Sequence, residues 1–194
     1  MSPLLETLAG DSVRGYGMFS PSATAGGNFT SIATVTSSGS GAYISFTSIP
    51  STYTHLQVRW MIRDGYSGSG RNNLIMEMNG DTTNTNYYRH GLQGDGSSAG
   101  TQYGNDDIVS SSSVANGSAA NIFGVGVTDI LDYTNTSKNK TVRTLSGADF
   151  NGSGAVMLNS YVWNNTSAVN SLRFWAGGLN NWVAGTTFAL YGVK

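Results

Sequence analysis

Between Leu56 and Arg63, large apolar residues occupy every second position: Leu56, Val58, Trp60 and Ile62. Successive side chains of a β-strand point to opposite faces, so this period of two places the four residues on one buried face of a strand. We expect the intervening side chains to point outward: Gln57, Arg59, Met61 and Arg63. The pattern therefore predicts a strand with one face in the core.

Short strands and turns then recur along most of the chain. Turn pairs such as Asn79-Gly80 and Asn151-Gly152 supply the positive φ of tight hairpins, and we find no amphipathic helical stretch of the kind a parallel α/β fold needs between strands. We expect an all-β fold, an antiparallel β-sandwich of jelly-roll type with about ten short strands. The expected strands are Phe29–Thr36, Ala42–Phe46, Thr54–Arg63, Asn73–Met78, Tyr87–Leu92, Ile122–Tyr133, Lys140–Ser146, Ala155–Trp163, Ser171–Ala176 and Thr187–Val193.

Two segments depart from this pattern. Residues 1–28 lack strand periodicity, and we interpret them as an irregular N-terminal arm in front of a β-sandwich domain of residues 29–194. The arm either anchors the protein to a neighbouring subunit or wraps its own domain; its apolar residues favour the anchor. They are Leu4, Leu5, Leu8, Tyr16, Met18 and Phe19. The stretch from Gly94 to Gly117 is rich in Gly and Ser and is predicted to be a long loop for binding or subunit contact.

The composition argues against several classes of partner. Charged residues are 11% of the 194 residues, against roughly 25% in a typical soluble domain, so Ser, Thr, Asn and Gly must cover the surface. With a net charge of −1 and only Lys138, Lys140 and Arg143 close together, we expect no binding to nucleic acid or to a membrane surface. No cysteine is available for a disulfide, a thiolate nucleophile or a zinc site.

The N-terminal sequence does not have the pattern of a secretory signal, and no apolar run approaches the roughly 20 residues of a membrane helix. A surface of extracellular type without an export signal is expected for a virion protein that assembles in the cytoplasm of its host. An export route that reads no N-terminal signal is the alternative.

Catalytic and metal-binding patterns are weak. His55 and His90 are interpreted as strand-end residues. Ser98 lies in a G-x-S-x-G match, but that motif marks a nucleophile only between a strand and a helix. Oxygen ligands for calcium are scattered, without the spacing of a calcium loop: Asn79, Asp81, Asp106 and Asp107. We expect a protein that is not an enzyme and has no catalytic residues, cofactor or metal site.

Aromatic residues are the remaining candidates for recognition. Trp60 shares its face with apolar neighbours and is predicted to be in the core, whereas Tyr66, Tyr103 and Trp182 are candidates for an exposed, sugar-binding surface. Packing of these three under a loop or against another subunit is the alternative.

Several blocks of sequence resemble virion proteins of tailed phages, notably those of cyanophages and marine phages. The blocks occur in the same order and cover most of the chain: Ser12–Gly17, Phe46–Arg59, Met76–Asp81 with Tyr87-Tyr88, Ile130–Arg143 and Phe188–Lys194. The resemblance implies a non-enzymatic component of the virion surface, either a capsid decoration, cement or head-fibre protein or a tail fibre.

The short chain without a fibrous shaft favours the decoration protein, which would contact phage capsid or tail proteins. We further expect a homotrimer that buries an apolar strand face, either Leu172 with Phe174 or Val156 with Leu158. Two other hypotheses about function stay open. One is a carbohydrate-binding module or tail-fibre tip that recognises a host polysaccharide, and the other is a glycosidase or lyase on a sandwich fold.

Overall fold

The computed structural model describes residues 28–104, 108–150 and 152–194, together with the side chains of these residues other than 108–111. The predicted arm, with its six apolar residues, lies outside the described residues except for Asn28. The described residues form twelve strands and two short 3₁₀ turns, Asn84–Asn86 and Gly177–Leu179. The strands are β1 (Phe29–Thr36), β2 (Tyr43–Phe46), β3 (His55–Asp64), β4 (Arg71–Met78), β5 (Tyr87–Gly94), β6 (Ala99–Gly104), β7 (Ile108–Ala115), β8 (Gly124–Leu131), β9 (Lys140–Asp149), β10 (Gly154–Trp163), β11 (Leu172–Ala176) and β12 (Thr187–Val193).

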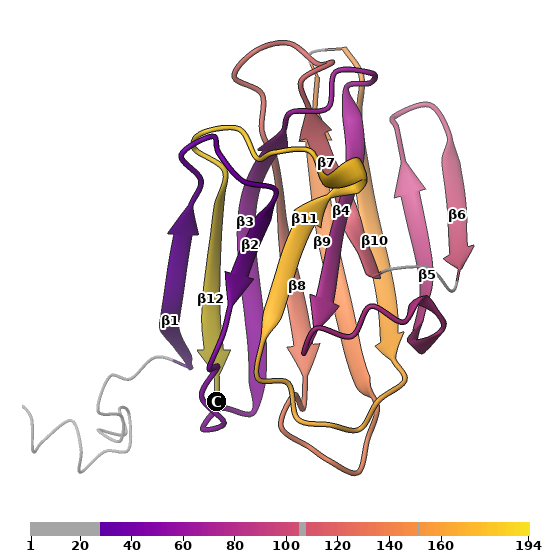
Figure 1. Cartoon of the computed structure of the whole chain (residues 1–194). Helices are drawn as coiled ribbons and strands as arrows, with labels where there is room; N and C mark the ends of the chain where they lie inside the picture. Colours follow the sequence, from indigo (N-terminus) through magenta and orange to yellow (C-terminus); the bar gives the residue numbers. More distant parts are fainter. Residues whose placement is uncertain (1–27, 105–107, 151) are drawn as a thin grey trace, which may run out of the picture.

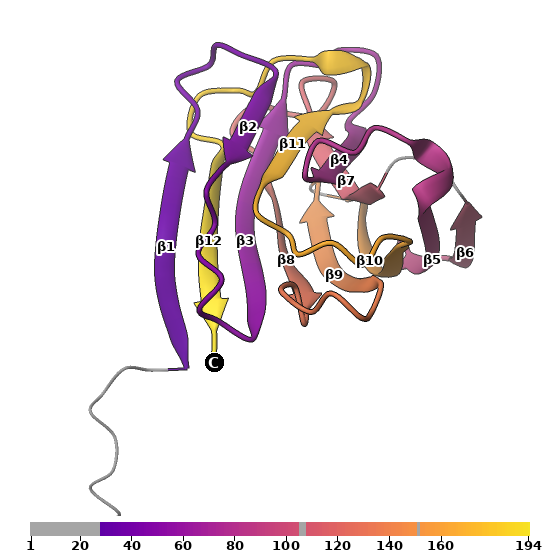
Figure 2. The same cartoon turned by 60° about the horizontal axis from the view of Figure 1, so that its bottom comes forward.

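The strands form two layers, which confirms the predicted all-β sandwich (Figures 1 and 2). Eight strands pair antiparallel in the order β1-β12-β3-β8-β9-β10-β5-β6. Four strands, β2-β11-β4-β7, form the smaller layer. The end of β3 joins the layers by pairing in parallel with β7, at Arg63 with Val114 and Asp64 with Ala115. This parallel pair departs from the purely antiparallel expectation.

The core lies between the layers and includes the face of β3 that the alternation predicted. Leu56, Val58, Trp60 and Ile62 are all buried, and burying a side chain of this size stabilises a fold by about 1.5–3 kcal/mol. Opposite Trp60, β8 carries Gly126. A Cβ on Gly126 would lie 2.2 Å from the Trp60 ring, so the indole occupies the space that a side chain would need.

Leu172 and Phe174 belong to this same core, so the prediction that they form a subunit contact is wrong. Phe174 of β11 packs against Phe188 of β12, with ring centroids 4.7 Å apart, and thereby connects the two layers. The side chains are apolar because they face the other sheet of their own domain.

Two buried cations fix loops at opposite ends of the sandwich. Arg63, at the end of β3, donates five hydrogen bonds to residues 116–122, mostly to backbone carbonyls. At the start of β9, the Lys140 Nζ donates to the carbonyls of residues 135, 138 and 166. The prediction that Arg63 points outward is therefore wrong: where β3 leaves the larger sheet, the loop between β7 and β8 covers the guanidinium.

The predicted loop from Gly94 to Gly117 instead contains β6 and β7. Asp95 closes the β5–β6 hairpin by accepting hydrogen bonds from the backbone N–H groups of Ser97 and Ser98. Strand β6 then pairs with β5, and β7 pairs with β4. Ladder hydrogen bonds to formed neighbours thus outweigh the weak β propensity of a Gly/Ser-rich sequence. In the described part of the chain, no helix is long and apolar enough to span a membrane.

Candidate interaction surface on the eight-stranded sheet

The outer face of the larger sheet carries a continuous set of apolar side chains, which we call the apolar band. The smaller sheet lies against the opposite face (Figures 1 and 2). The apolar side chains of the outer face are largely in contact with solvent. The band consists of Met61, Leu92, Val125, Val127, Leu145, Val156 and Leu158. All but Val127 are exposed by 45% to 60%.

Strand register brings the band together. Leu145 of β9 lies opposite both Val127 of β8 and Leu158 of β10, and Leu158 lies opposite Leu92 of β5. Directly opposed side chains on one face of a sheet have Cβ atoms about 4.5–5.5 Å apart, so the four side chains form one row across the sheet. Val125 and Val156 belong to the next row, where both lie opposite Gly147.

A polar network borders the band on the same face. Gln57 donates to Asp129 at 2.8 Å and accepts from the Arg59 Nε at 2.8 Å. Arg143 forms an ion pair with the other oxygen of Asp129, at 2.9 Å. Arg59 also lies over the rings of Phe29 and Tyr191, at 5.4 and 5.1 Å. The charges beside the band are therefore satisfied within the chain.

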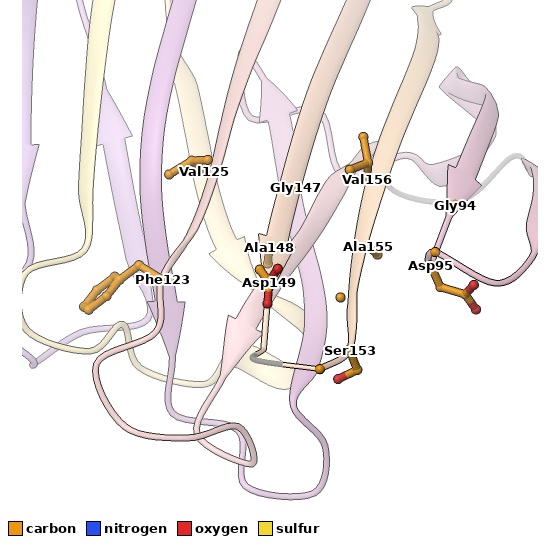
Figure 3. A pocket seen from close by; sticks show the side chains of 13 residues that line it. Gly94, Asp95, Phe123, Val125, Gly147, Ala148, Asp149, Ser153, Ala155 and Val156 are labelled. Atoms are coloured by element: carbon orange, nitrogen blue, oxygen red, sulfur yellow. The ribbon is translucent and has the colours of Figure 1, made fainter.

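A hollow of ≈ 570 Å³ adjoins the band at the end of β9 (Figure 3). Figure 3 shows Val125 and Val156 on the strands that flank β9, with Asp149 at the end of β9 between them. Much of the remaining lining is glycine: Gly94, Gly96, Gly147, Gly152 and Gly154. Missing side chains, rather than a cleft between elements, thus account for much of this hollow.

The other carboxylate of this hollow, Asp95, is not suited to acid catalysis. The N–H groups of Ser97 and Ser98 hold the pKa of Asp95 far below its usual range, and the hydroxyls of both serines add two further hydrogen bonds. A general acid at neutral pH needs a raised pKa. Asp95 instead stabilises the hairpin turn.

A second hollow, of ≈ 400 Å³, lies at the other end of the band, on β5, β6 and β10. Tyr103, a predicted recognition residue, lines it and is 82% exposed. It lies opposite His90, which in turn lies opposite Ser160, while Leu92 and Leu158 of the band contribute the apolar part. An exposed aromatic ring beside an imidazole and a hydroxyl offers both stacking and hydrogen bonding to a ligand.

The other two predicted recognition residues lie elsewhere. Tyr66 is 39% exposed in the loop between β3 and β4 and lines neither hollow. Trp182 is only 1% exposed, and its ring packs edge-on against Phe188, with centroids 5.5 Å apart. The prediction of a surface role for Trp182 is therefore wrong, because the loop that carries it folds into the core beside Asp64, with which it forms a β-bridge.

Two of the oxygen ligands considered for calcium hold turns together. Burial pushes the pKa of Asp81 upward, but hydrogen bonds from Trp163, Asn86 and Thr83 outweigh it and leave the pKa below its ordinary value. The Trp163 indole N–H donates to Asp81 Oδ2 at 2.7 Å. Asn79 bonds the backbone of Ala168 and Asn170. Among the residues that the structure describes, which do not include Asp106 and Asp107, no three His, Asp or Glu side chains come together.

The histidines contact different surroundings. His55 is the first residue of β3, and its Nδ1 accepts the backbone N–H of Asp132 at 3.0 Å. A hydrogen bond from Lys138 holds the pKa of Asp132 below its usual value, so this carboxylate is also engaged. His90 lies beside Tyr103 in the second hollow. The structure thus separates the two histidines, which rules out a shared site.

Sequence reasoning missed a polar cluster on the outer face of the smaller sheet. Arg173 of β11 forms an ion pair with the buried Glu77 of β4, at 2.5 Å. Its guanidinium also lies over the rings of Tyr43 and Trp175, at 4.9 and 5.5 Å. These residues alternate with core residues in their strands, and this alternation was the available signal. The charges are paired across strands, which suits a structural role.

Comparisons with known proteins identify no relative: no family model matches the chain, and no curated protein or solved structure matches it significantly.

Proposed function

We propose that this protein is a non-enzymatic structural component of a bacteriophage virion, namely a capsid decoration or cement protein that acts by contacts between subunits. The apolar band is the observation that carries the proposal. Contiguous exposed apolar patches on the order of a few hundred Å² are often functional, and larger ones mark interfaces. The protein would assemble in the host cytoplasm and lie on the surface of the particle.

Contacts of this kind require no catalytic residues. Apolar surface removed from water contributes about 25 cal/mol per Å², so a broad apolar contact can hold neighbouring subunits together on the particle. Two of the carboxylates beside the band, Asp95 and Asp129, are held by hydrogen bonds or an ion pair. This engagement favours a contact surface over a pair of carboxylates for glycoside hydrolysis, in which one acid has a raised pKa.

The resemblance to tailed-phage virion proteins supports the same proposal. Three of its blocks contribute to β3, to β8 and β9, and to β12, which are neighbours in the larger sheet: Phe46–Arg59, Ile130–Arg143 and Phe188–Lys194. These three segments thus lie on neighbouring strands of the larger sheet.

Recognition of a host glycan, as a tail fibre or appendage, is the second candidate. The exposed ring of Tyr103 beside His90 and Ser160 favours it. A glycan array probed with the full-length protein and with Tyr103→Ala tests this function. Loss of a signal in the variant would support glycan recognition at this hollow, whereas equal signals would exclude Tyr103 as the contact.

Co-sedimentation with tailed-phage capsids tests the main proposal. The full-length protein should pellet with capsids and saturate, and a variant without residues 1–27 measures what the arm contributes. Asn28 is kept, because its carbonyl accepts the N–H of Lys194. If neither protein pellets with capsids while the full-length chain binds host polysaccharide, the appendage replaces the decoration protein.

A further inference from the structure

We propose that the apolar band is the contact between copies of this chain, so that the protein self-associates through the outer face of its larger sheet. The inference deepens the proposed function, on which it rests for the role of surface contacts, by naming the partner of this surface. Two strand faces were expected as alternatives for the contact within a homotrimer. Leu172 and Phe174 are internal, so only the face with Val156 and Leu158 is available for that contact.

The sequence of β10 is that of a strand covered on both faces. In β10, Ala155, Val156, Met157 and Leu158 form an uninterrupted apolar run. Strands with one solvated face alternate apolar and polar residues, whereas strands buried on both faces have nearly continuous apolar runs. Ala155 and Met157 face the interior, so the run indicates that Val156 and Leu158 are also covered in the working protein.

The size of the band fits a stable contact. It crosses five strands, from β3 to β5, and strands about 4.8 Å apart make it about 20 Å wide. Burying a Val, Leu or Met side chain contributes about 1.5–3 kcal/mol at about 25 cal/mol per Å², which corresponds to on the order of 100 Å² each. The half-exposed band therefore offers roughly 350 Å² of the about 800 Å² per partner of a stable interface. The bordering polar network and Tyr103 can supply the remainder as a rim.

Charge complementarity favours a copy as the partner. The band has no charged side chain, and the bordering network contains both signs, in Asp129 and in Arg59 and Arg143. A strongly charged partner would find no complement on this face, whereas a second copy presents a matching apolar centre and the same mixed border. The net charge of −1 also means that copies repel one another little.

Sedimentation velocity of the full-length protein and of single variants tests the inference without any capsid. Leu145→Lys and Leu158→Lys place a charge in the band, while Leu179→Lys is the matched control, because Leu179 is 51% and Leu145 50% exposed. We expect the wild type and the control to form the same closed oligomer at micromolar concentration. The band variants should associate at least about 30-fold more weakly, as for interface hot spots.

A monomeric wild type would overturn the inference, as would an oligomer that both band variants leave unchanged. An oligomer that dissociates only when residues 1–27 are removed would overturn it too, because the arm would then be the contact. A monomer that still pellets with capsids would overturn the inference and keep the proposed function. A chain that self-associates through the band but does not pellet with capsids would support the inference and overturn the proposed function.

The absence of native cysteine allows a second, direct test. Single cysteines at Val125, Leu145, Leu158 and Leu92 should include at least one that cross-links to a second copy on oxidation, since a disulfide forms only when Cα atoms lie within about 7 Å. Leu179→Cys should stay uncross-linked. Cross-linking at Leu179 alone, or at none of the band positions, would contradict the proposal.

Discussion

Leu145 of β9 lies directly opposite Leu158 of β10 on the outer face of the larger sheet, and the two side chains are 50% and 45% exposed. Two neighbouring leucines of this exposure at the centre of a sheet gain little stability within their own domain. The proposed contact between copies would cover both side chains.

This pair leads to a prediction about stability. Leu145→Lys should change the free energy of unfolding of the dissociated monomer by no more than about 0.5 kcal/mol, because the side chain points away from the core. Leu190→Ala, at a fully buried position of β12, should cost about 2–5 kcal/mol. Denaturant unfolding at low protein concentration measures both. A large loss in Leu145→Lys would mean that this leucine packs within the monomer.

Gly126 and Gly147 allow a matched test of the core. Gly126→Ala should destabilise the fold by about 1–3 kcal/mol, because the new Cβ would lie 2.2 Å from the Trp60 ring. Gly147→Ala, on the outer face, meets its nearest atom at 3.4 Å and should be nearly neutral. Thermal unfolding followed by circular dichroism compares the two. Equal losses would show that Trp60 does not require the glycine.

Arg63 and Arg59 lie four residues apart on β3 but have different surroundings. Arg63→Met should destabilise the fold by about 3 kcal/mol or more, because it removes five hydrogen bonds and leaves buried carbonyls without a donor. Arg59→Met loses contacts with Phe29 and Tyr191 that are worth about 1 kcal/mol at an exposed site. If the two variants unfold at the same denaturant concentration, the buried arginine has no special role.

Asp81 should make the free energy of unfolding depend on pH in the acidic range. Its pKa in the folded state lies below the ordinary 3.8, so the carboxylate contributes stability that is present above that value. This contribution is lost as the pH falls through the folded pKa, because protonation weakens acceptance of the Trp163 N–H. Asp81→Asn cannot titrate, so its stability should fall less than that of the wild type between about pH 5 and pH 2.

The free energy of unfolding, measured by denaturant titration at each pH, checks this prediction. Asp95 and Asp132 also have lowered pKa values, but they contribute equally to both proteins and cancel in the comparison. Parallel pH curves for the wild type and Asp81→Asn would contradict the assignment.

The sequence was sufficient to predict the strands and their inward faces where the period of two coincided with burial between the sheets. The inward face of β3 is one example, and ten of the twelve strands were expected within a few residues of their ends. It failed at Arg63, because position in an alternating strand does not reveal that a loop will cover the strand end. It also failed at β6 and β7, where pairing with β5 and β4 decides the conformation of Gly- and Ser-rich segments.

The candidate surface was only partly visible in the sequence. The exposure of Tyr103 agrees with expectation, but Trp182 was misplaced because nothing local indicates whether a loop tryptophan folds inward. The apolar band depends on cross-strand register, which assembles residues from Met61 to Leu158. The continuous apolar run of β10 was its one local signal.

The most direct measurement of the central claim is cryo-electron microscopy of tailed-phage capsids with and without the full-length protein. We expect additional density on the outer capsid surface, at regular positions of the lattice, into which the two-layered sandwich fits. Identical maps from the two samples, with the protein in large excess over capsid subunits, would contradict a role as a capsid decoration protein.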